Sequence, residues 1–297
     1  MEVIEPRSDP CLPALARLLG AGELVAYRPT RRAVVRLPDD GAGHGRFAKV
    51  LRPGRAARIV ARHHAMEAAA SAAGPGFPSF PRVLEWSDGE GLVVLSGAPG
   101  RSLYALVRQD PGATGPATAV GRALACLHVA PLPSGLRAAP RARPLDRWMP
   151  RIAPFVDAAT LARYESVLVG LPPAREAGRP GLVHGDLHDG NVFVRDDEVA
   201  LIDLDAAGAG DPAIDVGTLA AHLVLRGLQA GGDPGPGRRM VLSLVRAYVE
   251  AGGPAEEPAI GGACARGLFR LACVYVVRPR WRGACPALLE EAARSDP

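Results

Sequence analysis

The sequence predicts an α+β fold in which a small β-rich N-terminal lobe precedes a larger, mainly helical C-terminal lobe. Five short β-prone runs and a single long helical segment fall between residues 20 and 97. Beyond residue 115, most segments have the apolar spacing of amphipathic helices. The segment 184–205, with two short apolar β-prone runs around a polar turn, interrupts these helices. We therefore expect two lobes, 1–97 and 98–297, with a site near their junction.

The N-terminal lobe is expected to be an antiparallel sheet with one long crossing helix. Polar or Gly-containing turns separate the β-prone runs, and the residues around Ser96–Gly100 break the regular pattern. We expect a Gly-rich loop at Pro38–Gly45. The expected elements are a short helix Leu12–Leu19, strands Glu23–Tyr27, Ala33–Leu37 and Arg46–Leu51, a helix Arg55–Ala70, and strands Arg82–Trp86 and Leu92–Leu95.

The C-terminal lobe is expected to be mostly helical. Apolar residues recur at helical spacing in Ala117–His128 and in Pro150–Leu168, and a Pro- and Arg-rich loop at 131–145 lies between these two segments. Further helices are expected around 213–228, 238–251, 262–277 and 286–294. Loops at 230–237 and 252–262 separate them.

Composition excludes several classes of protein. A chain of 297 residues with 48% hydrophobic content can bury a substantial core, and a net charge of +4 does not suggest nucleic acid as a partner. The five cysteines have no CxxC spacing, which favours structural thiols in a reducing compartment. The acidic, Pro-containing N-terminus does not fit a signal peptide, and the apolar run Leu271–Val277 is too short to span a bilayer. We expect a soluble cytoplasmic protein with no membrane partner.

The segment HGDLHDGNVFVRDDEVALIDLD, residues 184–205, carries the most information about function. Two β-prone runs, 192–194 and 199–204, flank a polar turn and should pair antiparallel. Asn191 before the first run and Asp203 near the end of the second should then meet at one end of the hairpin. A carboxylate and an amide oxygen are ligands suited to Mg²⁺. Asp186 lies just upstream on a Gly-containing loop, where it remains free to accept a proton.

Lys49 is the only lysine in the chain. Lysine and arginine together number 35, so 34 of them are arginine. The bias indicates that arginine replaces lysine wherever either side chain will do. A compact ammonium and a planar guanidinium are not equivalent, so the remaining lysine indicates a position where arginine does not serve.

His-x-Asp-x4-Asn followed by a strand-terminal Asp is the catalytic layout of the kinase fold. The HGD form and the tail 210–215, GDPAID, fit one branch of that fold. The chain resembles the aminoglycoside phosphotransferase/choline kinase family over roughly residues 20–225. The resemblance implies a protein-kinase-like two-lobe fold with nucleotide bound by 1–97 and acceptor by 98–297. It also implies an ATP- or GTP-dependent, Mg²⁺-requiring phosphotransferase acting on a small-molecule hydroxyl.

The resemblance implies roles for the residues of the hairpin and its loop. Asp186 is expected to be the general base for the acceptor hydroxyl, and such a group contributes about 10²- to 10⁴-fold to the rate. Asn191 and Asp203 are expected to bind the metal that bridges the nucleotide phosphates. Asp205 either contacts a second metal or caps the following loop. His188 either reaches a phosphate or substrate, or is a partly exposed loop residue.

The N-terminal lobe is expected to hold the nucleotide. The resemblance implies that Lys49 contacts the α- and β-phosphates and pairs with Glu67, the only acid of its helix; a solvated helix residue is the alternative for Glu67. No G-x-G-x-x-G motif precedes the second strand. The turn 28–32, RPTRR, stands there instead, with arginine side chains and the Thr30 hydroxyl available to cover phosphate. Backbone groups from Ser96 to Ala98 are expected to read the base edge.

Other residues of the motif are expected to support the loop. His184 should hydrogen bond from the interior, Asp215 should accept backbone N–H groups of 184–186, and Asp211 should tie the segment to the next helix. His128 is expected to be a packed structural residue.

The acceptor is not specified by the motifs. Residues 101–180 hold five acids and eleven basic residues, and 207–297 hold nine and ten, which weakly disfavours a polycationic acceptor. A neutral or anionic hydroxyl compound such as a sugar, nucleoside or macrolide is more compatible. The alternatives are a catalytically silent kinase-like binding protein and a protein kinase, although the chain lacks D-F-G and A-P-E. We expect a monomer or a homodimer.

Overall fold

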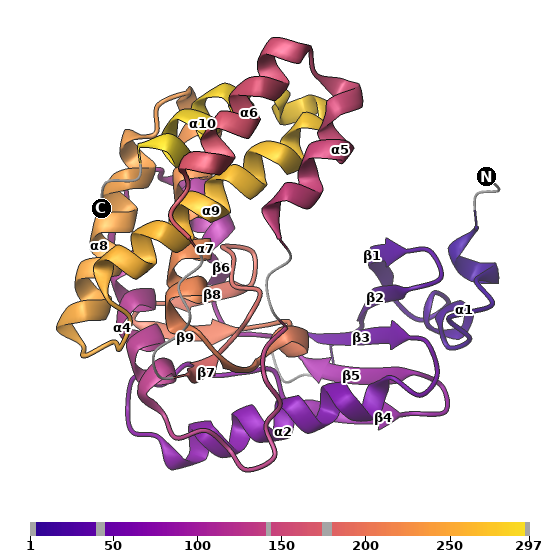
Figure 1. The fold of residues 1–297 in the computed structure, drawn as a ribbon. Helices are drawn as coiled ribbons and strands as arrows, with labels where there is room; N and C mark the ends of the chain where they lie inside the picture. Colours follow the sequence, from indigo (N-terminus) through magenta and orange to yellow (C-terminus); the bar gives the residue numbers. More distant parts are fainter. Residues whose placement is uncertain (1–3, 40–44, 141–143, 174–179, 295–297) are drawn as a thin grey trace.

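The computed structural model describes residues 4–39, 45–140, 144–173 and 180–294. Figure 1 shows a sheet with one long helix beside it, followed by a larger group of helices, with a small cluster of short strands where the two parts meet. The predicted α+β, protein-kinase-like architecture is confirmed. Residues 40–44 of the expected loop Pro38–Gly45 and residues 141–143 of the loop 131–145 lie outside the described residues.

The N-terminal sheet has the five expected strands in the order β1-β2-β3-β5-β4, and every neighbouring pair is antiparallel. Lys49 lies on β3, opposite Val34 of β2 and Val93 of β5. The lysine is therefore on the central strand of the sheet. The strands are β1 (Glu23–Arg28), β2 (Arg32–Leu37), β3 (Arg46–Leu51), β4 (Val83–Ser87) and β5 (Leu92–Ser96).

The alternation of side chains divides this sheet into two faces. Ala48 and Val50 of β3 point to one face, where they pack with the buried leucines of the N-terminal segment around α1 (Leu15–Leu18). Leu51 packs on the other face, against α2 (Ala56–Ala72). Lys49 shares this second face and is only 6% exposed. The central strand thus carries its ammonium toward α2 and the junction.

Helix α1 is shorter than the expected Leu12–Leu19. It begins only at Leu15, after a 3₁₀ turn η1 (Pro6–Ser8) and non-helical turns around Pro13. Leu12 is nevertheless buried with Leu15 and Leu18, so the apolar spacing correctly identified the packed residues.

The remaining chain forms a helical part with two apolar clusters. The helical pattern expected in 150–168 is present as two helices with a 3₁₀ turn, η3 (Ala153–Phe155), between them, and the Asp157 side chain caps the start of the second by accepting from Thr160 N. Helix α3 was not expected; Ser102 Oγ caps it by accepting from Ala105 N. The helices are α3 (Leu103–Gln109), α4 (Gly115–Val129), α5 (Met149–Ile152), α6 (Ala158–Gly170), α7 (Pro212–Gly231), α8 (Gly235–Glu250), α9 (Glu257–Val276) and α10 (Cys285–Ala293).

Helix α9 alone among the described residues has the length and hydropathy of a membrane span. Its mean hydropathy is 1.3 over the apolar window, but 56% of that window is buried within the fold. This burial is typical of a core helix. The five cysteines are free thiols, and Cys273 and Cys285 are buried.

Short strands join the two parts. The predicted hairpin consists of β8 (Val192–Arg195) and β9 (Glu198–Leu201), and β6 (Arg101–Ser102) pairs with the open edge of β8. A second pair, β7 (Gly181–Val183) and β10 (Gly208–Gly210), brackets the loop and hairpin in sequence. The segment 184–207 is therefore held at both ends by antiparallel pairing.

Asp9 ties the N-terminal segment to the turn between β1 and β2. Its buried carboxylate accepts from Thr30 N at 2.7 Å, from the Tyr27 hydroxyl at 2.9 Å and from Cys11 N at 2.9 Å. Burial raises the pKa of Asp9, but these three hydrogen bonds outweigh it and hold the pKa below its ordinary value.

Replacing Asp9 by asparagine should therefore destabilise the fold by about 1–3 kcal/mol at pH 7, because a charged acceptor of three donors is lost. The folded-state pKa is lowered, so the stabilisation is complete well above the ordinary value of 3.8 and is lost as the pH falls through the folded pKa. Urea unfolding at pH 7 and pH 3 checks this: the difference between wild type and variant should shrink at pH 3. The exposed Asp146→Asn is the control. A variant as stable as wild type at pH 7 would contradict the prediction.

Candidate active site

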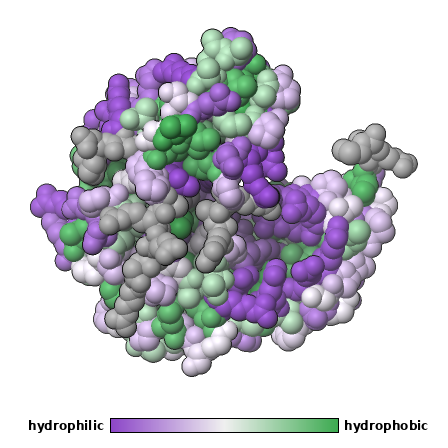
Figure 2. Space-filling view, in the orientation of Figure 1, coloured by the Kyte–Doolittle hydropathy of each residue, from purple (hydrophilic) through white to green (hydrophobic). Residues whose placement is uncertain are grey.

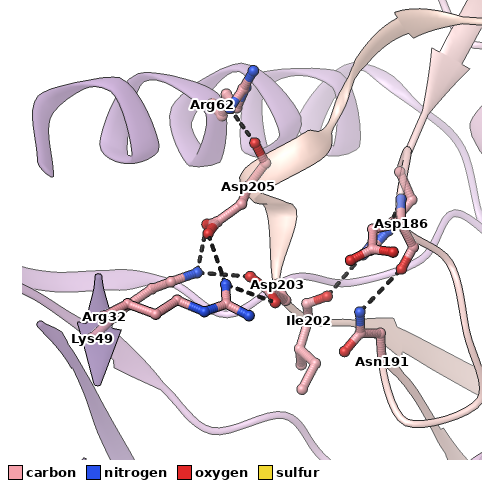
Figure 3. A network of polar contacts seen from close by, with 9 residues as sticks. Arg32, Lys49, Arg62, Asp186, Asn191, Ile202, Asp203 and Asp205 are labelled. Carbon is pink, nitrogen blue, oxygen red and sulfur yellow. Dashed lines mark hydrogen bonds and ion pairs between the residues drawn. The ribbon is translucent and has the colours of Figure 1, made fainter. Parts of the chain in front are cut away.

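The hairpin brings Asn191 and Asp203 to one end, as the strand pairing predicted. Val192 lies opposite Leu201, and Ile202 N donates to Asn191 O at 3.0 Å. Figure 3 shows the side chains of Asp186, Asn191 and Asp203 on neighbouring segments of the chain. Asp203 has φ 63° and ψ 58°, a left-handed backbone that aspartate adopts more readily than most residues. Such backbones cluster at functional sites.

Asp186 is exposed, and its carboxylate makes no hydrogen bond within the described chain. Its backbone is fixed instead: Asp186 N donates to His184 Nδ1 at 3.3 Å, and Asp186 O accepts from Asn191 Nδ2 at 3.1 Å. The second bond uses the amide nitrogen of Asn191. The Oδ1 oxygen of this buried side chain is thereby left to accept another partner.

Lys49 is bound by two acids that follow β9. Its Nζ is 2.7 Å from Asp203 Oδ1 and 2.5 Å from Asp205 Oδ1. Only the first contact has hydrogen-bond geometry; Asp205 Oδ1 is buried without a hydrogen bond. Arg32 Nη1 approaches the same carboxylates at 3.7 and 3.4 Å (Figure 3). Two cations from the sheet therefore face two acids from the helical part.

Lys49 and Arg32 stabilise the ionised form of Asp203. Burial raises the pKa of its carboxyl, but Lys49 and Arg32 outweigh the burial and hold the pKa below the ordinary value. An ionised carboxylate beside the free Oδ1 of Asn191 is a set of hard oxygen donors, which fits a divalent cation. The buried Oδ1 of Asp205, without a hydrogen bond, adds a further oxygen on the same side.

Asp205 had two interpretations, metal contact or loop cap. Its carboxylate faces Lys49 and Arg32, and its backbone carbonyl accepts from Arg62 of α2. Figure 3 shows this side chain directed toward the cations. The geometry favours a place in the site over capping.

The expected ion pair between Lys49 and Glu67 is not formed among the described residues, because Lys49 is occupied by Asp203 and Asp205. Glu67 is half-buried on α2, and the residues of α2 that pack against the sheet are Ala56, Ile59 and Val60. His63 of the same helix is buried, and its Nδ1 lies 3.0 Å from Pro81 O. The role assigned to Glu67 stays a prediction.

Thr30 lies at a left-handed turn with φ 59°. Its backbone is fixed on both sides, since the N–H donates to Asp9 and the carbonyl accepts from Arg52 Nε at 2.6 Å. Its hydroxyl makes no hydrogen bond in the described part of the chain. The phosphate contact expected of Thr30 stays a prediction.

The segment after β5 has one free backbone N–H of the kind expected to read a base. Ser96 N donates to Arg82 O at 2.9 Å and Gly97 N to Gly45 O at 2.8 Å, so both are used within the sheet. Ala98 makes no backbone hydrogen bond within the described residues, and it is only partly exposed. The backbone N–H of Ala98 is therefore still able to bind the edge of a base, whereas the N–H of Ser96 is already used.

The supporting residues act as expected. His184 is fully buried, and its Nε2 contacts Ile202 O at 2.8 Å. Asp215, in the first turn of α7, accepts from His184 N at 2.6 Å and Gly185 N at 2.9 Å. His128 is buried against the Tyr248 hydroxyl at 3.0 Å, a structural contact.

Sequence reasoning missed the partners of Asp189. This residue is fully buried and pairs with Arg226 and His222 of α7. A signal was present, because His222 and Arg226 lie on a largely apolar helix, and a charged residue on a packed helix requires a partner. The other missed group is His63, which the sequence showed only as one of two adjacent histidines.

The sequence model of the phosphotransferase enzyme family matches residues 29–259, more than half of the chain. The chain belongs to this family. It is a family of phosphotransferase enzymes. A curated relative, the methylthioribose kinase of Bacillus velezensis, is 42% identical over 52 residues, which cover 18% of this chain and only 13% of the relative.

Solved structures of the same fold cover nearly the whole chain. The amicoumacin kinase solved with AMP-PNP, Ca²⁺ and amicoumacin is 15% identical, has a TM-score of 0.58, and is matched over 93% of this chain and 89% of its own. The spectinomycin phosphotransferase solved with ADP and spectinomycin is 12% identical with a TM-score of 0.60 over 93% of both chains. A choline kinase from Cryptosporidium parvum is 8% identical with a TM-score of 0.58, over 92% and 88%. At these identities the likeness shows the fold alone.

His63 gives the site a measurable pH dependence of stability. Burial, the largest cause, and the nearby Lys49 lower the pKa of His63 from 6.5 to about 4, although the Pro81 hydrogen bond and the carboxylates of Asp203 and Asp205 act to raise it. As the pH falls, His63 is protonated in the unfolded chain before it is protonated in the folded protein. The free energy of unfolding should therefore decrease by about 3 kcal/mol from this group as the pH drops from about 6.5 to 4. His63→Gln should remove that part of the slope in urea unfolding at pH 6.5 and 4.5. An unchanged slope would contradict the assignment, and the exposed His64→Gln is the matched control.

Proposed function

We propose that the protein transfers the γ-phosphoryl group of ATP or GTP to a hydroxyl of a small molecule, with Asp186 as general base. The observation that carries the proposal is the convergence of four groups around one region. They are the exposed carboxylate of Asp186, the oxygens of Asn191 and Asp203, and the ammonium of Lys49. Phosphoryl transfer needs positioning, a base and neutralisation of phosphate charge, and this set supplies each of them.

Asp186 has the freedom that a base requires. Its carboxylate is exposed and without a hydrogen bond in the described chain, while its backbone is fixed by His184 and Asn191. A hydroxyl bound beside it can donate its proton to this carboxylate and be oriented toward the phosphorus.

Asn191 Oδ1 and the Asp203 carboxylate would hold a divalent cation, and the Asp205 carboxylate would add a further oxygen. When bound, Mg²⁺ supplies charge neutralisation at the phosphate oxygens. Asn191 contributes a neutral oxygen whose direction is set by the bond from Nδ2 to Asp186 O. Asp203 contributes a carboxylate that stays ionised at neutral pH.

Lys49 and Arg32 are the cations for the nucleotide phosphates. They face the two acids in this structure, and the polyphosphate of a nucleotide offers them a second set of anionic oxygens. Figure 2 shows a hollow between the helical part and the sheet, with hydrophilic surface on both of its sides. We assign the nucleotide to the sheet side of this hollow, with Thr30 over the phosphates, Glu67 near Lys49, and Ser96–Ala98 beside the base.

The acceptor is assigned to the helical side of the same hollow. Two of the proteins with this fold are an amicoumacin kinase and a spectinomycin phosphotransferase. The excess of arginine in 101–180 argues for a neutral or anionic hydroxyl compound over a polycation. We further propose a cytoplasmic protein that acts as a monomer or homodimer.

Replacing Asp186 by asparagine tests the base. The variant should lose about 10²- to 10⁴-fold in turnover with Mg·ATP on the best acceptor of a panel of sugars, nucleosides and antibiotics. Nucleotide affinity, measured by calorimetry with ADP and Mg²⁺, should stay within about threefold, because Asp186 does not contact the cations of the sheet.

Asp197→Asn, in the exposed turn of the same hairpin, is the matched control and should turn over like wild type. Nucleotide binding without turnover on any acceptor, in wild type as in the variant, would instead favour a catalytically silent binding protein.

Lys49→Arg tests the need for an ammonium. The site holds the Lys49 Nζ between two carboxylates at 2.7 and 2.5 Å while 6% of the residue is exposed, which leaves no room for a planar fork. We expect kcat/KM for nucleotide to fall by about tenfold or more. The reverse exchange at an exposed helix position, Arg246→Lys, should leave it unchanged. A fully active Lys49→Arg protein would remove Lys49 from the phosphate site.

A further inference from the structure

Helix α7 carries three ionisable side chains, Asp215, His222 and Arg226, and each of them contacts the catalytic loop 184–191. The first two bonds run from the start of the loop, His184 N and Gly185 N, to Asp215. The others run from the carboxylate of Asp189 to His222 and Arg226. All three ionisable residues of this largely apolar helix thus contact one loop.

The contact between Arg226 and Asp189 is bidentate and buried. Arg226 Nε lies 2.5 Å from Asp189 Oδ2 and Nη2 lies 3.1 Å from Oδ1, while His222 Nδ1 lies 3.4 Å from Oδ1. Asp189 has no exposed surface. Burial raises the pKa of Asp189, but His222 and Arg226 outweigh it and bring the pKa to about 2. The carboxylate is therefore ionised throughout the neutral range.

A second element fixes the same residue from the other side. Tyr104 N, at the start of α3, donates to Asp189 O at 3.0 Å. The Tyr104 ring lies under the Arg226 guanidinium, 4.6 Å from its carbon to the ring centroid. Asp189 is thus held through its side chain by α7 and through its backbone by α3.

The two anchors bracket the base. Asp215 and Arg226 are eleven residues apart, about 16 Å along a helix. Between the points they hold, 184–185 and 189, lies Asp186, whose own side chain has no hydrogen bond in the described chain. Asn191 follows Asp189 by two residues. The distance between Asp186 and Asn191 therefore depends on a loop that is bound to α7 at two points, Asp215 and Arg226.

A buried ion pair is a weak source of stability, because an apolar pair of similar volume is often as stable or more so. Its value lies in fixing one geometry, since a guanidinium fork accepts a carboxylate in few orientations. We propose that Arg226, assisted by His222, is a positioning residue that holds Asp189 and thereby sets the place of Asp186 relative to Asn191. This inference rests on the proposed function.

Arg226→Lys keeps the charge but loses the fork, and it is the first test. We expect turnover to fall by about tenfold or more, with KM for Mg·ATP within about threefold, because a small misplacement of a catalytic group is costly while the sheet side of the nucleotide site is untouched. Hydrogen exchange in peptides covering 187–195 should become faster. Exchange at 181–185 should stay as in wild type, since Asp215 still holds that end.

Arg238→Lys is the matched control. Arg238 makes the same bidentate contact with Glu291, at 2.9 and 2.6 Å, between α8 and α10. Turnover and exchange in the catalytic loop should both be unchanged in this variant.

A double variant, Asp189→Asn with Arg226→Met, removes both charges and leaves no unpaired buried ion. It should fold, as judged by its thermal transition, and still show the lowered turnover and the faster exchange at 187–195. Wild-type turnover in the folded double variant, or turnover of Arg226→Lys within threefold of wild type, would overturn the proposal.

The exchange measurement separates the two levels of inference. If wild type transfers no phosphoryl group to any acceptor, the proposed function fails, but faster exchange at 187–195 in Arg226→Lys still supports the hold on the loop. If hydrogen exchange at 187–195 is the same in Arg226→Lys as in wild type, Arg226 does not hold the loop, and the proposal is overturned whatever the turnover.

Discussion

The ammonium of Lys49 joins the two halves of the protein at the point where chemistry is proposed. It extends from the central strand of the sheet to Asp203 and Asp205 behind the hairpin, and Arg32 reinforces it. The left-handed backbone at Asp203, the antiparallel pairs that bracket 184–207 and the packing of α2 all serve to present those two carboxylates to the sheet. Without this contact between opposite charges, no ion pair would hold the cations of the sheet next to the oxygens of the hairpin.

The parts that could be predicted from sequence are those determined by local pattern. Strand alternation gave β3 with Lys49 on it, and antiparallel pairing gave the meeting of Asn191 and Asp203. The interior role of His184 and the acceptance of backbone N–H groups by Asp215 also followed from the motif. These are short-range relations, in which the chain itself fixes the distance between the residues.

The parts that could not be predicted depend on how separate elements meet. Glu67 was expected to pair with Lys49 because it is the only acid of α2, but the sequence does not show which side of α2 packs on the sheet. In the structure, the acids that pair with Lys49 come from the end of the hairpin, and the buried His63 of α2 contacts Pro81 O. Asp189 and Arg226 are 37 residues apart, and no local pattern relates them. Helix α3 was missed because its start depends on one capping bond from Ser102. Packing of one element on another decides these cases.

The single lysine has a chemical consequence of its own. Every other basic side chain in the sequence is a guanidinium or an imidazole, so Lys49 is the only side-chain amine available to acylating or alkylating reagents. It is also 6% exposed and clasped by two carboxylates. The rate at which this amine is modified therefore reports, without any label or engineered residue, how often the sheet and the hairpin separate in solution.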